Sequence, residues 1–302
     1  MATAQCELCD ESGDTVERRV YRAIRLAQGP TPGDKELPES LGFIKRLRKD
    51  WLAAGSPSRC IEVAGGHGLV SLLLLSLGLS RDATIVDPFR PRSFDTLLSA
   101  FREAGLLPES YSLQYDERPL DEALPYLLRG GDGGGGGTVV VACHACAHLT
   151  RDLVEIAVAE RAAGIAVMPC CHSRRTVAGA DRTKHAADAL GLPLGVVADI
   201  ALLGRLEAAG YDARLRVVEA CAPSSNRVVV AFRRGEGSGG ARLWEGSAAR
   251  ARASEGLSRA YERVHAARPA GTGRKARNRE RREYRAARER DRLPSVKNKD
   301  AV

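Results

Sequence analysis

The chain has 302 residues, of which 44% are hydrophobic and 5% aromatic, a composition typical of a globular protein and unlike that of fibrous or membrane proteins. The longest apolar run, residues 69–79, is too short to span a bilayer and indicates a buried helix. Residues 1–237 hold 28 Lys and Arg against 30 Asp and Glu, whereas residues 238–302 hold 18 against 8. The net charge of +8 therefore resides in the carboxyl-terminal segment.

The amino-terminal stretch "MATAQCELCDESGD" is acidic and has no apolar run, so we expect no secretory signal. Eight cysteines without such a signal indicate a reducing compartment, where thiols serve as core residues, ligands or reactive groups. We therefore expect a cytoplasmic protein that does not bind a membrane. In a eukaryotic host the basic tail is also a candidate nuclear or nucleolar address.

Two amphipathic helices are predicted at residues 14–28 and 39–54, separated by the breaker stretch "GPTPGD". Strands and helices then alternate. The predicted strands are "RCIEVAG", "ATIVD", "YSLQY", "TVVVACH" and "IAVMPC", and the helices between them include "LVSLLLLSLGL", "RSFDTLLSAFREAG" and "LTRDLVEIAVAERAAG". Buried apolar strands that alternate with helices predict a parallel sheet in an α/β domain.

The series ends differently, in a helix followed by the strands "ARLRVVEAC" and "NRVVVAFRR". Only "APSS" joins these strands, and so short a link cannot contain a crossover helix, so the pair is expected to be antiparallel. The predicted organisation is a helical extension at 1–55, an α/β domain at 56–235, and a Gly-rich linker with a basic, helical or disordered tail at 236–302.

A glycine turn, "IEVAGGHGLVS", lies between the first strand and the first helix of this domain. Glycine there lets the backbone approach a ligand closely, and the following helix offers free N–H groups. As a dinucleotide fingerprint the turn has Gly66 and Gly68 but Ser71 at the third glycine position. It matches the pattern acid-x-small-x-Gly-x-Gly through Glu62, Ala64, Gly66 and Gly68.

Asp87 ends the second strand, nineteen residues beyond Gly68, where a carboxylate can meet a ribose diol. Asp116 follows the third strand and is expected to meet an adenine amine. A structural strand–turn–helix with an incidental acid is the alternative for the glycine turn alone. With Asp87 and the final hairpin added, a nucleoside cofactor is favoured, and S-adenosylmethionine (SAM) more than NAD.

Residues 58–234 resemble class I SAM-dependent methyltransferases, and more narrowly the subgroup that contains the tRNA acceptor-stem 2′-O-methyltransferases. The resemblance lies in "EVAGGHG", in "HACAHLT" after the fourth strand, in "PCCH" after the fifth, and in "PSSNRVVVA" in the last hairpin. It implies a Rossmann-like sheet, mostly parallel with a carboxyl-terminal antiparallel hairpin, SAM as the cofactor, and methyl transfer as the reaction.

Cysteine and histidine residues are concentrated in "CHAC" and "PCCH", at the ends of the fourth and fifth strands. If these strands are neighbours, about 5 Å separates them and the two clusters face each other. Zinc bound by Cys143 and Cys146 with Cys170, Cys171 or His172 is disfavoured because the spacings are not those of structural zinc sites, so no metal is expected. A redox pair of the thioredoxin type is also disfavoured, because "CHAC" follows a complete cofactor loop.

The interpretation favoured for this rim is an acceptor site for methyl transfer. The protein must align the acceptor with the methyl group and remove a proton where the acceptor is a hydroxyl or amine. His144, Cys146 and His172 are the candidate catalytic residues, as base or hydrogen-bond partners, because an imidazole pKa lies near neutrality. Attack on an RNA base by a cysteine thiolate is a minority alternative. Cys60 and Cys221 are expected to be small buried hydrophobes.

The tail segment 274–293 mixes arginine with glutamate at helical spacings and is strongly positive. Such a segment binds phosphates without sequence preference, and the alternative is a solvated, disordered terminus. The leading hypothesis is a SAM-dependent methyltransferase that acts on RNA, with tRNA as one candidate. The rivals are a methyltransferase for a small molecule or protein, and an inactive methyltransferase fold that binds RNA.

Overall fold

The computed structural model describes residues 15–55, 57, 59–130, 137–145, 148–170, 172, 177, 180–219, 221 and 226–234. The chain divides into two units, Met1–Glu236 and Gly237–Val302. The second unit, which contains the predicted basic tail, lies outside the described residues, as do Cys146 and Cys171. The account below therefore concerns the first unit.

Helices and strands alternate through most of this unit. The helices are α1 (Val16–Leu26), α2 (Glu36–Ala53), α3 (Leu69–Ser76), α4 (Arg92–Glu103), α5 (Leu120–Arg129), α6 (Leu149–Ala159), α7 (Ala180–Leu190) and α8 (Leu194–Ala208). The strands are β1 (Arg59–Val63), β2 (Asp82–Val86), β3 (Ser112–Asp116), β4 (Thr138–Cys143), β5 (Gly164–Met168), β6 (Tyr211–Val217) and β7 (Arg227–Arg233).

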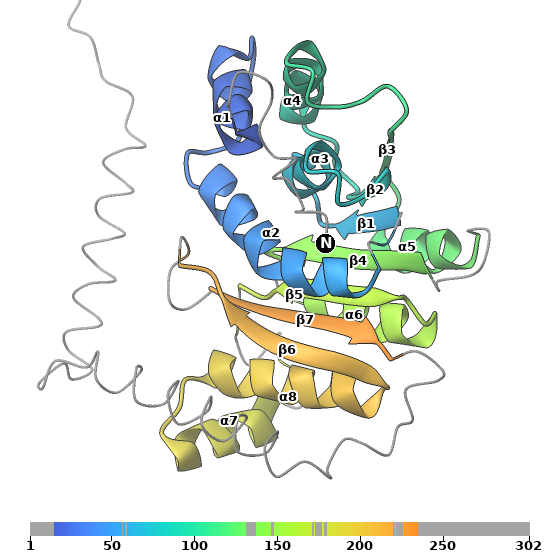
Figure 1. Ribbon diagram of the computed structural model, residues 1–302. Helices are drawn as coiled ribbons and strands as arrows, with labels where there is room; N and C mark the ends of the chain where they lie inside the picture. Colours follow the sequence, from blue (N-terminus) through green and yellow to red (C-terminus); the bar gives the residue numbers. More distant parts are fainter. Residues whose placement is uncertain are drawn as a thin grey trace, which may run out of the picture. The chain divides into compact units, whose positions relative to one another are not determined.

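The strands form one sheet in the order β3-β2-β1-β4-β5-β7-β6, which Figure 1 shows from β3 above to β6 below. Strands β1 to β5 are parallel, and β7 pairs antiparallel with both β5 and β6. This order, with its terminal hairpin, is that of class I methyltransferases. The predicted fold class is confirmed, including the antiparallel pairing of the last two strands.

Helices cover both faces of the sheet, and the strand sequences alternate accordingly. In β4, Val139 and Val141 pack in the cluster formed with α1 to α4, whereas Val140 and Ala142 pack in the cluster formed with α5, α6 and α8. All four side chains are fully buried. Successive residues of a strand point to opposite faces, so a sheet covered on both sides needs continuous apolar strands.

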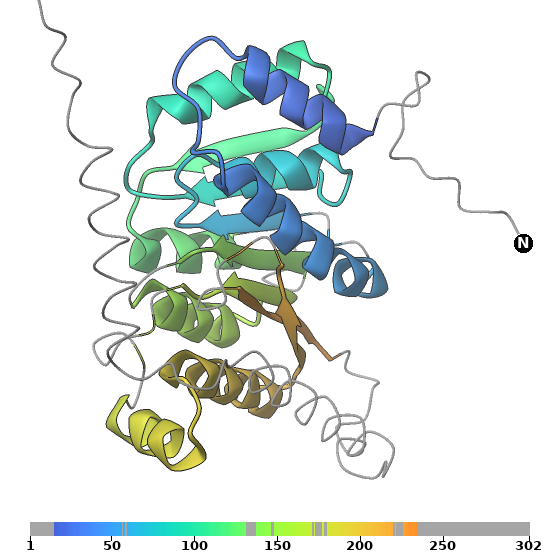
Figure 2. The same ribbon diagram turned by 90° about the vertical axis from the view of Figure 1, so that its left-hand side faces the viewer.

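The two amino-terminal helices belong to the same core as the sheet. Helix α1 packs against α4, and α2 packs against α3 and β7 (Figures 1 and 2). Phe43, Leu47 and Trp51 of α2 are fully buried, and the Trp51 Nε1–H donates to the Leu79 carbonyl at 2.7 Å. Helix α2 begins at Glu36, three residues before the predicted start, which places Glu39 in its first turn.

The structure adds helix α7, which the sequence patterns did not predict, before the expected helix α8. Gly191, with φ of 64°, and Pro193, which precedes the first residue of α8, separate the two. Among the described helices, none by itself has both the length and the apolar composition of a membrane-spanning helix. Helices α7 and α8 meet these criteria only when taken together, across a bend of 116°.

Strand β6 ends at Val217, four residues before the predicted end at Cys221. The ladder with β7 stops there, although the Val218 N–H still donates to the Asn226 carbonyl at 2.7 Å. Cys221 then lies in a turn, where its N–H faces the Val218 carbonyl at 3.4 Å. It is buried, as expected of a small hydrophobe, but it reaches the carboxyl edge of the parallel strands rather than a strand interior.

Candidate functional site

The glycine turn connects β1 to α3 through a backbone that only small residues adopt easily. Ala64, Gly66 and Gly68 all have positive φ, at 53°, 46° and 66°. At Gly68 a Cβ atom would collide with Ile85 of β2, so the turn packs directly on the neighbouring strand. At Gly66 no described atom lies within 4 Å of the corresponding position. The turn is therefore closed beneath Gly68 and open above Gly66, where a ligand can approach the backbone.

Glu62 precedes the turn and is only 3% exposed. Its Oε2 accepts a hydrogen bond of 2.8 Å from the Ser71 N–H, in the first turn of α3. Burial raises the pKa of the Glu62 carboxyl to about 7, against the opposing effect of the hydrogen bonds from Ser71. The predicted cofactor residue is therefore a buried carboxyl group with a raised pKa, fixed at the amino terminus of α3.

Asp87 lies directly after β2, and its carboxylate reaches the glycine turn. Its Oδ2 accepts from the Gly66 N–H at 3.0 Å, and its Oδ1 accepts from the Phe89 N–H at 3.0 Å. The hydroxyl of Tyr115 donates to the carbonyl oxygens of Gly66 (2.9 Å) and Phe89 (3.0 Å), which binds the two loops together. A carboxylate oxygen can accept two hydrogen bonds, so each oxygen of Asp87 can still accept one from a ligand hydroxyl.

Asp116 is the last residue of β3, in register with Val86 of β2, and its carbonyl accepts from the Asp87 N–H at 3.1 Å. Its carboxylate is bound by Arg118, whose Nε lies 2.9 Å from Oδ1 and 3.2 Å from Oδ2. These hydrogen bonds lower the pKa of the Asp116 carboxyl. The guanidinium of Arg118 also lies over the ring of Tyr126, at 4.6 Å from its centroid. The group expected to meet an adenine amine thus already has a cationic partner.

A cavity of about 590 Å³ opens beside these loops, between the ends of β1 and β2 and helix α6. Its walls combine apolar side chains with four carboxylates and one imidazole, from Asp87, Asp121, Asp152, Glu155 and His148. Asp152 and Glu155 are paired with Arg151 and Arg205, whereas Asp87 accepts from backbone N–H groups. The carboxylate of Asp87 thus gives the cavity a negative potential that suits a ligand with positive charge.

His67 is a residue of the glycine turn to which the sequence assigned no role. Its Nδ1 is hydrogen-bonded to the Ser93 hydroxyl at the start of α4, and its Nε2 lies 3.3 Å from Glu36 Oε2 at the start of α2. The turn is thereby connected to two helices. The sequence held no signal for this, because neither partner lies near His67 in the chain.

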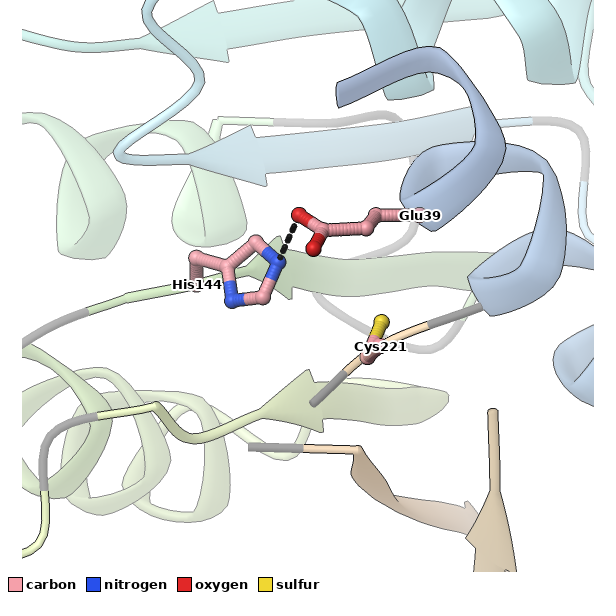
Figure 3. A group of neighbouring side chains, drawn as sticks. All are labelled: Glu39, His144 and Cys221. Atoms are coloured by element: carbon pink, nitrogen blue, oxygen red, sulfur yellow. Dashed lines mark hydrogen bonds and ion pairs between the residues drawn. The ribbon is translucent and has the colours of Figure 1, made fainter. Parts of the chain in front are cut away.

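His144 lies directly after β4, at the rim that was predicted to receive the acceptor. Its N–H continues the ladder by donating to the Met168 carbonyl at 3.1 Å, yet its φ is 64°, in the left-handed region that disfavours residues with a Cβ. The imidazole Nε2 lies 2.9 Å from Oε2 of Glu39 (Figure 3). The His144 side chain is 30% exposed and that of Glu39 17%. The predicted base candidate is therefore accessible and held by a carboxylate.

Two cysteines accompany this pair. Cys221 offers a sulfur that lies, with the ligand atoms of Glu39 and His144, in a group whose members are all within 4.8 Å of one another (Figure 3). Burial raises the pKa of the Cys221 thiol to about 11 and that of Cys143 well above its ordinary value. Both thiols are thus protonated near neutrality, which disfavours either as a thiolate nucleophile.

Cys170, after β5, also lies near His144. Its Sγ is 3.7 Å from the His144 carbonyl oxygen, and it is disulfide-bonded. Among the described cysteines, Cys60, Cys143 and Cys221 are free. The candidate residue Cys146 also lies outside the described residues, so its catalytic role stays a prediction.

His172, the third candidate catalytic residue, occupies a different environment. Its Nε2 lies 2.8 Å from Asp199 Oδ1, and Asp199 Oδ2 accepts from the Arg227 Nε–H at 2.5 Å. The side chains are 11%, 2% and 12% exposed, respectively. A Cβ at Gly195 of α8 would lie 2.8 Å from His172 Nδ1. This network joins the end of β5 to α8 and β7, and it encloses the imidazole that was predicted to face the acceptor.

No family model and no curated protein matches the chain. Among solved structures, it is similar to the O-methyltransferase TomG of Streptomyces achromogenes, in complex with SAM (17% identity, 76% of this chain and 93% of that chain, TM-score 0.42). It is also similar to the magnesium protoporphyrin IX methyltransferase ChlM of Synechocystis PCC 6803, with bound SAH (12% identity, 72% and 93%, TM-score 0.42). The tRNA methyltransferase TrmK of B. subtilis matches at 12% identity (63% and 66%, TM-score 0.37). Likeness at this level carries no conclusion about activity, and the fold assignment rests on the strand order.

Proposed function

We propose that the protein is a SAM-dependent methyltransferase that acts on RNA. The observation that supports this most is a convergence at one edge of a sheet with the methyltransferase strand order. The open glycine turn after β1, the carboxylate of Asp87 after β2, and the pair of His144 and Glu39 beside β4 all lie at that edge. Ligands of doubly wound sheets bind beyond the carboxyl ends of the strands.

On the cofactor side, the backbone at Gly66 is open to a ligand, and Asp87 would accept hydrogen bonds from ribose hydroxyls. The acidic cavity attracts a ligand that carries a sulfonium and an ammonium. SAM, when bound, supplies a methyl group already activated for transfer. The remaining tasks of the chain are to align the acceptor and to remove its proton.

On the acceptor side, His144 is the group placed to take that proton. A neutral imidazole that donates its Nε2–H to Glu39 leaves Nδ1 as a proton acceptor. Within the described residues, Nδ1 of His144 has no hydrogen-bond partner. The carboxylate of Glu39 would orient the ring and stabilise the imidazolium that forms when the acceptor O–H or N–H gives its proton to Nδ1.

RNA is the acceptor favoured by the charge distribution and by the resemblance of "HACAHLT" and "PCCH" to the tRNA 2′-O-methyltransferase subgroup. Residues 238–302 carry 18 basic against 8 acidic residues, whereas residues 1–237 carry 28 against 30. A slightly acidic body repels a polyanion at long range, and a tethered basic tail offsets this by raising the local concentration. A small-molecule or protein acceptor, and an inactive fold that binds RNA, are the rival functions.

The test begins with isothermal titration of SAM into the full chain and into the variants Asp87→Ala and Asp95→Asn. Asp87→Ala should weaken SAM binding more than about tenfold, because a charge-assisted hydrogen-bond pair is lost. Asp95, an exposed carboxylate on α4, should be without effect. Transfer of a radiolabelled methyl group is then screened on RNA, protein and metabolite fractions. Absent SAM binding would support the inactive fold, and label confined to protein or metabolites would reject RNA.

A truncated chain that ends at residue 237 tests whether the basic tail binds RNA. Its SAM affinity should equal that of the full chain, whereas its RNA affinity should fall and depend less on salt, because phosphate contacts release counterions. The KM for RNA should change more than kcat, since a tethering contact stabilises ground and transition states equally. His144→Ala should instead lower kcat while RNA affinity is retained. Equal RNA affinity of both chains at every salt concentration would contradict the role of the tail.

A further inference from the structure

Three side chains from distant parts of the sequence converge beside the end of β4. Glu39 comes from the first turn of α2, His144 from the turn after β4, and Cys221 from the turn after β6. Their Oε, imidazole nitrogen and Sγ atoms all lie within 4.8 Å of one another, and Figure 3 shows the three side chains directed toward a common point. The described residues contain no second group of this kind.

Packing alone does not account for this group. The Glu39 carboxylate is 17% exposed and lies against Cys221, which is 6% exposed, so a carboxylate and a thiol share a site that is largely closed to water. His144 adopts φ of 64°, which costs roughly 1–2 kcal/mol for a residue with a Cβ. Backbone strain of this kind is concentrated at ligand-binding and catalytic positions.

We propose that Glu39, His144 and Cys221 bind a zinc ion. Imidazole nitrogen and thiolate sulfur are ligands that zinc prefers, whereas Mg²⁺ and Ca²⁺ favour oxygen ligands throughout. Three protein ligands with an open fourth position are the arrangement of catalytic rather than structural zinc. In forming the site the Cys221 S–H bond breaks, its proton passes to solvent, and a sulfur–zinc bond forms. The carboxylate and the thiolate then balance the two charges of the ion.

The distances are compatible with this ion. Bonds of 2.0–2.3 Å in a tetrahedron place ligand atoms roughly 3.3–3.8 Å apart. The hydrogen bond between His144 Nε2 and Glu39 Oε2 measures 2.9 Å, and no pair in the group exceeds 4.8 Å. Side-chain shifts on the order of 1 Å therefore convert the hydrogen-bonded pair into two ligands. This ligand set differs from the "CHAC" and "PCCH" combinations that the sequence suggested.

The role of the fourth position rests on the proposed function. In the zinc-bound protein it would take an acceptor hydroxyl, whose pKa the ion would lower so that its proton passes to solvent. His144 would then hold the ion, and its role as the base would apply to the metal-free protein. Metal binding itself does not depend on methyl transfer. A zinc site without SAM binding would reject only the proposed function, and SAM binding without zinc would reject only this inference.

The full chain is dialysed against Zn²⁺ and then against metal-free buffer. Its zinc content is then measured by inductively coupled plasma mass spectrometry. The variants are Glu39→Gln, His144→Asn and Cys221→Ser, because asparagine tolerates the left-handed backbone of position 144. Their matched controls are Glu36→Gln, from the same turn of α2, and His185→Asn, an exposed histidine of α7. Circular dichroism and SAM titration of the same samples report on folding.

We expect about one equivalent of zinc in the full chain and in both controls, and a loss of affinity of at least about tenfold in each ligand variant. With Co²⁺ in place of Zn²⁺, the near-ultraviolet thiolate-to-metal band should vanish in Cys221→Ser, while the visible bands of bound cobalt persist at higher metal concentration. No zinc above the dialysis blank would overturn the proposal. So would one equivalent retained by a folded Glu39→Gln, Cys221→Ser double variant, because the ion would then lie on other cysteines.

Discussion

Replacement of Glu62 by glutamine tests whether ionisation of the buried carboxyl beneath the glycine turn destabilises the folded protein. Glu62 is 3% exposed, and its Oε2 accepts from the Ser71 N–H at 2.8 Å. Glutamine retains an oxygen that can accept this hydrogen bond and has nearly the same volume. The substitution therefore removes the charge while it leaves the cap on α3 in place.

The magnitude follows from the pKa of Glu62, which burial raises from 4.5 to about 7. Because the folded state holds the proton more tightly than the unfolded state, the free energy of unfolding falls as pH rises between these two values. Below about 4.5 both states are protonated and nothing is lost. Above about 7 the full cost applies, and at 1.36 kcal/mol per pKa unit it amounts to about 3 kcal/mol. An ion-paired carboxylate has the opposite pH dependence, because it makes the free energy of unfolding rise with pH.

Urea denaturation of the full chain without cofactor, at pH values from 4.5 to 8, measures this directly. Glu62→Gln should match the parent near pH 4.5 and exceed its free energy of unfolding by roughly 1–3 kcal/mol at pH 8, since part of the gain is lost with the charge-assisted hydrogen bond. Glu103→Gln, at an exposed position on α4, is the control and should keep the pH profile of the parent.

A Glu62→Gln protein that is less stable than the parent at pH 8, with the parental pH profile, would refute this reasoning. It would mean that the ionised carboxylate stabilises α3 more than burial opposes it. If the reasoning holds, the retained charge needs a functional explanation. A cationic cofactor above the turn would supply one, and SAM affinity should then rise between pH 6 and 8 in the parent and stay level in the variant.

Further substitutions test the packing of the site. Gly68→Ala should destabilise the fold by roughly 2–4 kcal/mol, because the strain of positive φ adds to a collision with Ile85. Gly66→Ala should cost only about 1 kcal/mol, for the backbone strain alone. Equal losses of the two variants in urea denaturation would contradict the described turn. Asp199→Asn should cost roughly 3 kcal/mol while SAM affinity is unchanged, because the buried carboxylate joins the His172 ring to the Arg227 guanidinium. The exposed Asp188→Asn should change stability by less than about 0.5 kcal/mol, and a comparable loss there would argue against the network.

Most of the fold could be predicted from local sequence because the strands of the parallel sheet are short and bounded by turn residues, and all but the polar edge strand β3 are apolar. The predicted four-residue link before Asn226 was sufficient to fix the last pair as antiparallel, and the observed link between Val217 and Arg227 is still too short for a crossover helix. Helix α7 was missed because its sequence, "ADRTKHAADAL", buries only Ala187 and so lacks an apolar stripe. The end of β6 was placed too late because "VVEAC" continues the apolar strand pattern after the ladder has stopped.

The geometry around the candidate site residues was predictable on one side and not on the other, and the reason is sequence separation. Gly66, Gly68 and Asp87 lie within one strand–turn–helix–strand unit, where a fixed spacing reports a fixed geometry. Glu39 and His144 are 105 residues apart, and only the packing of α2 across the sheet brings them together. A glutamate in an amphipathic helix is indistinguishable from a solvated one until its partner is known.

The two rim histidines show how the same residue type acquires different roles from its surroundings. Both follow the end of a parallel strand, and both contact a carboxylate through Nε2, at 2.9 Å in His144 and 2.8 Å in His172. For His172 the carboxylate also binds Arg227, and α8 encloses the ring, so the imidazole is fixed between structural elements. For His144 the ring stays accessible and a buried thiol, Cys221, lies beside the carboxylate. Burial and the third neighbour, rather than the histidine–carboxylate contact, therefore distinguish the two environments, and the catalytic role expected of His172 stays a prediction.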